Sequence, residues 1–592
     1  MRAGPERTGG RGGGFGGLLA AAALAALALA PLLGRGYVLV YDMVFVPRMQ
    51  LTRELLGLGT AVARAVPSDL LVALASRALP ADVLQKLVLV AIFVGGGWGA
   101  ARLAPAMTAL GGAAAAALYV WNAHVYERLL IGHWALLVSY AALPWVVGAA
   151  IAWRDGGRPV HGLVASLAVA ACGSPPGGAI AVATALLVVA WPARRREAVT
   201  RPALRRAGVV LAAGLLLNAP WWAPSVLRPG GVPARPVGVA AFASRPDGPL
   251  GTVGTLLGLG GIWNARVVPP GHGSWLWWPG FAVVLAVAAL GWRVLPRRWP
   301  RGAALGLLAA AATGLALAAA YAAPGLRALV DLAVLHLPGG GLLRDAEKLV
   351  APLALVEAVG FGVGAEWLLS ALAGRRTRAA LAAVLVAAPV LLLPALAWGA
   401  AGRLQPVAYP REWAAAREVM AADPVPGAML VLPWHLYLAF PWNGNRTVLD
   451  PAQRYFTRRA VGNDDLELAG VTVPGEDPYG ARLAPLVTGP APFAPGLGAA
   501  GIRYVLAFKL AGVERFTPRL AGLAMVLDNP ELSLYRVPDP AVAHLPGASG
   551  RGPVLLADAL ALATLAWAVT GLAMAGRRRK LVSSRRSGEG SR

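Results

Sequence analysis

Long apolar runs separated by short polar loops recur along the first 400 residues and again near the C-terminus. Most of these runs have about the length that a helix needs to cross a bilayer. They predict about twelve transmembrane helices, near residues 15–34, 84–103, 106–121, 134–153, 159–172, 177–192, 207–223, 275–295, 302–321, 347–371, 378–399 and 553–575. The fifth and sixth runs are short, which leaves open that one of them is a re-entrant segment.

A different pattern begins near residue 400, where charged residues reach an ordinary frequency. Alternating or β-branched runs at 428–432, 502–508 and 532–537 predict strands, and the pattern at 411–422 predicts a helix. These features indicate a small α/β domain. The chain therefore divides into a transmembrane domain at 1–400, an extracytoplasmic α/β domain at 401–552, and a last transmembrane helix with a basic cytoplasmic tail at 553–592.

Composition supports this division. Of the 592 residues, 57% are hydrophobic and only 14% are charged, and the mean hydropathy is +0.59. A soluble chain carries about a quarter charged residues. The sequence therefore predicts a polytopic α-helical membrane protein in contact with a lipid bilayer.

The net charge of +25 is unevenly distributed. Lys and Arg gather in short loops and in both tails, among them Arg102, Arg154, Arg158, Arg194, Arg201, Arg205, Arg206, Arg301, Arg375 and Arg577. Such clustering is the positive-inside signature, so it indicates orientation and no nucleic-acid partner. With both termini cytoplasmic, every basic loop falls inside the cell. The abundance of Ala, Gly and Arg indicates a high-GC bacterium, so the expected location is the inner or plasma membrane.

The first loop expected outside, residues 35–47, contains a single acidic residue, Asp42. One interpretation is a loop-capping or salt-bridged aspartate, because Arg48 lies six residues further on. The other is a general base for a hydroxyl nucleophile, or a metal ligand. Apolar neighbours raise the pKa of a carboxyl group toward the range that suits a base.

The next outer loop is denser in polar chemistry. Within residues 121–134 it holds His124, Tyr126, Glu127, Arg128 and His133. An aromatic belt at the membrane surface accounts for the aromatic residues. It does not account for two histidines, an acid and an arginine, which a simple hairpin loop does not need.

A third polar cluster, Arg344, Asp345, Glu347 and Lys348, opens the tenth apolar run. The helix dipole favours the two acids in a first turn. It disfavours Arg344 and Lys348, whereas basic side chains beside a helix N-terminus suit a phosphate or pyrophosphate. In the predicted topology all three clusters lie at the outer membrane face, so we expect them to form one site.

Together these clusters resemble the GT-C superfamily of integral-membrane glycosyltransferases. The resemblance consists of an Asp in the first outer loop, an aromatic-acid-Arg…Gly-His second loop, and Arg-Asp-x-x-Lys at the entry to a late span. It covers roughly residues 15–400 and is to the bacterial YfhO-like and arabinofuranosyl- or mannosyltransferase-like members. It implies a polyprenyl-phosphate sugar donor and a cell-envelope glycan or glycolipid acceptor.

The resemblance also implies roles for individual residues. Asp42 matches the catalytic acid of the first loop, and Glu127 is a second catalytic candidate. The residues expected to bind the lipid phosphate of the donor are Arg128, His133, Arg344 and Lys348. Those expected to support the site or the acceptor are Tyr126, His124 and Asp345. Many relatives carry a pair of acids in the first loop where this chain has one, so no cofactor is assigned and a divalent metal is left open.

Two further classes of function stay open from the sequence. A transporter for a lipid-linked glycan needs polar groups through the membrane, and Glu357 is the main charged residue within a predicted span. A non-catalytic envelope-polysaccharide assembly protein on a GT-C-like scaffold is the other alternative, because one acid is a sparse catalytic set.

The charge pattern generates a prediction about topology. Reporter fusions after Arg206 and Arg301 should report a cytoplasmic position, and fusions within 410–540 should report an external one. An external signal after Arg206 would contradict the predicted orientation.

Overall fold

The computed structural model describes residues 9–59, 62–103, 107–156, 159–193, 200–228, 235–295, 299–337, 339–468, 470–541 and 550–589. Arg158 and Arg194, which belong to the basic loops, lie outside these ranges.

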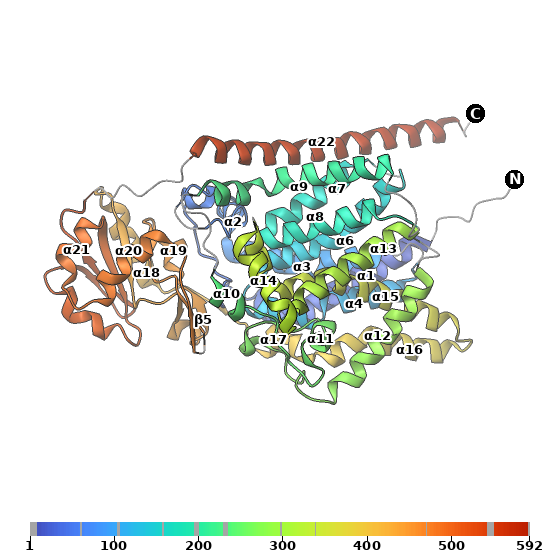
Figure 1. The fold of residues 1–592 in the computed structure, drawn as a ribbon, viewed down its shortest axis with the longest axis horizontal. Helices are drawn as coiled ribbons and strands as arrows, with labels where there is room; N and C mark the ends of the chain where they lie inside the picture. Colours follow the sequence, from blue (N-terminus) through green and yellow to red (C-terminus); the bar gives the residue numbers. More distant parts are fainter. Residues whose placement is uncertain are drawn as a thin grey trace.

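A helix occupies each of the twelve apolar runs, and most of these helices pack side by side in one bundle (Figure 1). They are α1 (Gly9–Leu29), α3 (Ala81–Leu103), α4 (Ala109–Val120), α6 (Trp134–Arg154), α7 (His161–Gly173), α8 (Pro175–Ala190), α9 (Arg201–Leu227), α12 (Trp277–Val294), α13 (Arg301–Ala320), α15 (Ala351–Ser370), α16 (Arg375–Leu392) and α22 (Arg551–Glu589). The long red helix α22 lies along the outside of the bundle, against α9 and α7.

Fewer than twelve of the described helices are long enough to cross a bilayer. Among the described residues, seven helices are long and apolar enough to cross a membrane, and two bent pairs raise this to nine. The pair Arg201–Leu217 and Ala219–Leu227 bends by 68°, beside Pro220, because a proline inside a helix removes a hydrogen bond and clashes with the preceding turn. The helices α4, α7 and α8 are shorter. The fold of a polytopic helical membrane protein is therefore present, while the twelve-span topology stays a prediction.

Basic helix ends meet at one end of the bundle. The indole of Trp299, just before α13, donates a hydrogen bond to the Leu103 carbonyl at the end of α3 (3.0 Å). The guanidinium of Arg154, at the end of α6, donates to Val188 and Trp191 at the end of α8 (2.8 Å each). In Figure 1 the start of α1 and the end of α22 lie at one end, and the sheet-containing domain lies at the other.

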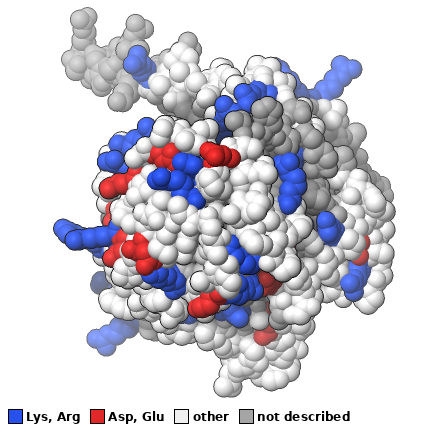
Figure 2. Space-filling view, turned by 90° about the vertical axis from the view of Figure 1, so that its left-hand side faces the viewer, with Lys and Arg blue, Asp and Glu red and all other residues white. Residues whose placement is uncertain are grey.

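The sheet-containing domain confirms the predicted strands and the helix at 411–422. Its five-stranded sheet has the order β10–β11–β9–β3–β6. The strands are β3 (Ala428–Leu432), β6 (Ala460–Val461), β9 (Ile502–Phe508), β10 (Ala524–Asp528) and β11 (Leu532–Arg536), with β3 parallel to β6 and β9 and the rest antiparallel. Helix α18 (Arg411–Ala422) contributes Trp413, which is fully buried and stacks on Phe456 and Phe508. Acidic and basic side chains are interspersed on the face seen in Figure 2.

A short stretch of β pairing joins this domain to the first loop. Strand β1 (Tyr37–Val38) pairs with β2 (Pro406–Val407), just after the bundle helices end. Beyond β1, the backbone of Tyr41 exchanges hydrogen bonds with Thr447 (2.7 Å) and Leu449 (2.9 Å), which lie in β5 (Thr447–Leu449) of the hairpin with β4 (Tyr437–Ala439). The residue that follows, Asp42, therefore lies at the junction between the bundle and the sheet-containing domain.

Candidate active site

The loop that carries Asp42 also packs closely on the turn between helix α5 (Ala123–Leu130) and α6. The amide of Asp42 donates to the Ile131 carbonyl (3.3 Å). Gly132 has φ +80°, and a Cβ atom there would lie 2.3 Å from the amide nitrogen of Met43. A side chain at position 132 would thus separate the two loops, so glycine is required for the approach that brings Asp42 to His133.

Two side chains hold the Asp42 carboxylate. The hydroxyl of Tyr437, from the sheet-containing domain, donates to Oδ1 at 2.6 Å. His133 Nε2 lies 3.2 Å from Oδ2. The Asp42 side chain is 40% exposed and that of His133 is 22% exposed, so both are partly accessible to solvent.

The sequence suggested a raised pKa for Asp42, and this expectation is wrong. Burial raises the pKa, but the hydrogen bonds from His133 and from the hydroxyl of Tyr437, with the nearby charge of Arg454, outweigh burial and lower it. Asp42 is therefore ionised at neutral pH. Its carboxylate is ready to accept a proton, although as a weaker base than an apolar loop would produce.

The imidazole of His133 links Asp42 to Arg128. Its Nδ1 lies 3.0 Å from Nη1 of Arg128. A guanidinium has only donors, so Nδ1 accepts from Arg128 and the proton on Nε2 faces Asp42. This tautomer follows from the hydrogen-bond network. Arg128 thus fixes the orientation of His133, and His133 in turn positions Asp42.

Arg128 is fully buried and neutralised by two carboxylates from the segment before α15. It donates to both oxygens of Asp345 (2.7 and 3.1 Å) and also pairs with Glu347. Burial raises the pKa of Asp345, but the charges of Arg128 and Lys348 hold it well below its usual range. The other oxygen of Glu347 contacts His124 Nδ1 at 2.7 Å. Helix α5 carries both partners of Glu347, His124 and Arg128. The Asn122 side chain caps the start of this helix by accepting from the amide of Val125 (3.0 Å).

The two cationic residues before α15, Arg344 and Lys348, differ in their partners. Lys348 is only 8% exposed, and within the described ranges its ammonium has no hydrogen-bond or ion-pair partner. Arg344 pairs with Glu476 of the sheet-containing domain (3.3 Å) and lies over the Phe242 ring. Because Arg128 is already paired with two carboxylates, Lys348 and Arg344 are the cations better placed to bind an anionic ligand.

Glu127 and Tyr126 belong to different surroundings from Asp42. The hydroxyl of Tyr126 accepts from Arg403 at 3.2 Å. Glu127 is fully buried beside Gly260, where a Cβ atom would lie 3.1 Å from Glu127 Oε1, 2.8 Å from Asp247 Oδ2 and 3.4 Å from His272 Nδ1. Burial raises the pKa of Asp247 to about 6. Burial and the charges of Glu347 and Asp247 also raise the pKa of Glu127. The structure therefore joins Asp42, His133, Arg128, Asp345 and His124 in one network, and Glu127 lies in a second carboxyl cluster.

Sequence reasoning missed three residues of these clusters. Glu347 was explained by the helix dipole alone, although it lies two residues from Asp345 and shares its partner. Tyr437 begins strand β4 and Asp247 lies outside the helices and strands, and only their positions in space connect them to the site. Within the described part of the chain, no group of three or more His, Cys, Asp and Glu side chains has an arrangement that could hold a metal ion.

Comparison with known proteins identifies the fold. No protein-family model matches the sequence, and no curated protein matches it. The arabinofuranosyltransferase AftD from Mycobacteria, solved by single-particle cryo-EM, superimposes with a TM-score of 0.59 at 16% identity, over 88% of this chain and 40% of AftD. A mutant of AftD gives a TM-score of 0.57 at 18% identity, over 88% and 41%. The chain thus spans about two fifths of the AftD chain. The fold of this chain is therefore similar to that of an arabinofuranosyltransferase, the kind of membrane protein that the sequence resemblance named.

The buried charges generate a prediction about stability. Arg128→Met leaves Asp345 and Glu347 buried without a counter-charge, which typically costs about 3–5 kcal/mol. We expect a large fall in the melting temperature of the purified protein in detergent. Adding Glu347→Gln to Arg128→Met should recover part of the loss, because one uncompensated charge is removed.

The control is Arg48→Met, at an exposed position just after the first loop. It should change the melting temperature little, since isolated surface charges contribute at most about 1 kcal/mol. Equal effects of Arg48→Met and Arg128→Met would contradict the structural role given to Arg128.

Proposed function

We propose that this chain is a membrane glycosyltransferase. It takes a sugar from a polyprenyl-phosphate donor and adds it to a cell-envelope glycan or glycolipid at the outer face of the membrane. The observation that carries the proposal is the Asp42 carboxylate, ionised and accessible, and held by His133 at the junction of the bundle and the sheet-containing domain. The AftD-like fold supports the same class of reaction.

In the proposed reaction Asp42 acts as the general base. An acceptor hydroxyl replaces one of the two hydrogen bonds on the carboxylate, from Tyr437 or His133, and its oxygen attacks the anomeric carbon of the donor sugar. The bond from that carbon to the phosphate oxygen breaks, the hydroxyl proton passes to Asp42, and the polyprenyl phosphate leaves with the bonding electrons. Attack from the face opposite the phosphate inverts the anomeric centre.

The departing phosphate gains negative charge, which a nearby cation stabilises most in a dry site. Lys348 suits this role, because its ammonium is buried and has no partner in the described residues. Arg344 is a second cation of the same segment, and it keeps part of its donor capacity after pairing with Glu476. Arg128 acts indirectly in this scheme, by holding His133 and Asp345.

One observation favours a non-catalytic alternative. Both oxygens of Asp42 already have partners, as in an aspartate that merely ties two domains together. A scaffold for polysaccharide assembly would need no more than this. A lipid-linked glycan transporter has less support, because the polar network lies at the ends of the helices rather than along them.

The first test separates catalysis from scaffolding. Asp42→Asn keeps the size of the side chain and can still accept from Tyr437, but it removes the proton acceptor. Incorporation of label from a polyprenyl-phosphate sugar into envelope glycan should fall about a hundredfold to ten-thousandfold. Asp528→Asn, an exposed aspartate paired with Lys509, should retain full activity. If Asp42→Asn restores glycan synthesis in a deletion strain at normal protein level, the scaffold alternative is correct.

The second test concerns the donor phosphate. Lys348→Gln removes a buried charge from the proposed phosphate contact, and a hydrogen bond to a charged group contributes about 1.5–3 kcal/mol. The KM for the donor should rise roughly tenfold to a hundredfold, with the KM for the acceptor unchanged. Lys509→Gln, on the surface of the sheet-containing domain, is the matched control. An unchanged donor KM at normal folding would place the phosphate elsewhere.

A further inference from the structure

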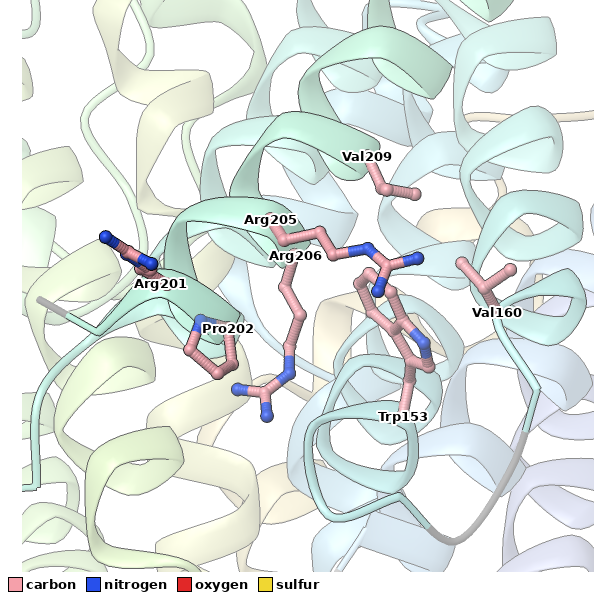
Figure 3. Close-up of a pocket in the computed structure, with 7 residues that line it drawn as sticks. All are labelled: Trp153, Val160, Arg201, Pro202, Arg205, Arg206 and Val209. Atoms are coloured by element: carbon pink, nitrogen blue, oxygen red, sulfur yellow. The ribbon is translucent and has the colours of Figure 1, made fainter.

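A cavity of about 620 Å³ lies at the end of the bundle away from the sheet-containing domain. It is formed by the end of α6, the residue before α7 and the first turns of α9 (Figure 3). Arg201, Arg205 and Arg206 line it together with the apolar side chains of Trp153, Val160 and Val209. The site thus combines three guanidinium groups with an apolar wall, and it lies far along the helices from Asp42.

The three arginines give the cavity a strong positive charge. They lie in the first two turns of α9, where the helix dipole adds further positive potential. Among the described residues no acidic side chain lines the cavity, and none of the three arginines forms an ion pair. The exposed carboxylate of Asp155 interacts electrostatically with Arg206. Clustered like charges repel each other, so an anion bound between them is strongly favoured.

The orientation of the arginine side chains also favours a ligand beside the indole of Trp153. In Figure 3 the guanidinium group of Arg205 lies beside the Trp153 indole and that of Arg206 extends into the space between Pro202 and Trp153, whereas Arg201 points the other way. Planar guanidinium groups bind phosphate oxygens through two parallel hydrogen bonds. Arg205 and Arg206 are therefore the pair that defines the phosphate position, and Arg201 adds charge at the rim.

The apolar wall distinguishes a lipid from a soluble anion. Trp153 is the next-to-last residue of α6, and the arginines open the first half of the bent pair in α9, so the cavity lies where both apolar helices end. This is the depth at which lipid headgroups meet hydrocarbon, and tryptophan is enriched there. A free phosphate gains nothing from Val160 and Val209, whereas the acyl chains and glycerol of a lipid do.

We propose that this cavity binds the phosphate of an anionic membrane lipid, with Arg205 and Arg206 on the phosphate oxygens and Trp153 against the glycerol and acyl region. Basic pockets between transmembrane helices are a known means of recognising such headgroups. The binding does not depend on glycosyl transfer, because the cavity and Asp42 lie at opposite ends of the bundle. It anchors the bent helix α9, and through α9 the neighbouring α22, to the bilayer surface.

The test uses the full-length protein purified in detergent and titrated with phosphatidylglycerol or phosphatidylcholine, with bound lipid counted by native mass spectrometry. The parent protein should retain phosphatidylglycerol and not phosphatidylcholine. The double variant Arg205→Gln with Arg206→Gln should bind phosphatidylglycerol about 25-fold more weakly, since each basic residue contributes roughly fivefold to binding an anionic lipid. The matched control is Arg375→Gln with Arg376→Gln, two exposed arginines that open α16 and do not line the cavity.

Two outcomes overturn the proposal. The first is equal retention of phosphatidylglycerol by the Arg205/Arg206 variant and the Arg375/Arg376 control. The second is displacement of the lipid by an equal concentration of inorganic phosphate, which would make the ligand a soluble phosphate. Arg205→Lys with Arg206→Lys, which keeps the charge and the packing, should restore most of the binding if the glutamine variant is folded, and its melting temperature provides that check.

Discussion

The burial of Arg128 against Asp345 and Glu347 is the interaction on which the candidate site depends. Removing a guanidinium and two carboxylates from water costs several kcal/mol for each ion, and only close pairing offsets this cost. The pairing joins residues 217 and 219 positions apart, so it fixes α5 against the segment that enters α15. With Arg128 held in this way, the tautomer and direction of His133 follow, and His133 positions Asp42. The buried ion pairs of Arg128 thus hold in place the residues that position the accessible Asp42 carboxylate.

The sheet-containing domain is part of the site rather than an appendage. Its hairpin pairs with the backbone at Tyr41, and its Tyr437 donates directly to Asp42. Glu476, from the same domain, pairs with Arg344. The loop at residues 35–47 is therefore held between the two domains, through β1 and the backbone of Tyr41. The geometry at Asp42 depends on the docking of both domains, because each supplies one partner to its carboxylate.

The two ends of the bundle have different chemistry, and the bilayer explains the difference. At the sheet-domain end, buried Arg128 is paired with the carboxylates of Asp345 and Glu347. At the other end, arginines line an open cavity beside apolar walls. Buried charges must be paired, whereas charges at a headgroup layer meet lipid phosphates. The two proposals follow this division, since glycosyl transfer is assigned to the sheet-domain end and lipid binding to the other end.

The sequence by itself determined the helices of the bundle, because apolar runs of this length form helices wherever water is absent. It also determined the strands at 428–432 and 502–508 and the presence of polar clusters at Asp42, 121–134 and 344–348. Only the tertiary structure decided which residues of these clusters meet. Glu347 became the second partner of Arg128, Glu127 turned toward Asp247, and Tyr437 reached Asp42 from about 400 residues away. Helical periodicity fixes the face of a helix on which a side chain lies, but not the distant loop that packs against that face. For the same reason the direction of the Asp42 pKa shift was not readable from its neighbours in sequence, since its three strongest partners are distant in sequence or placed by the fold.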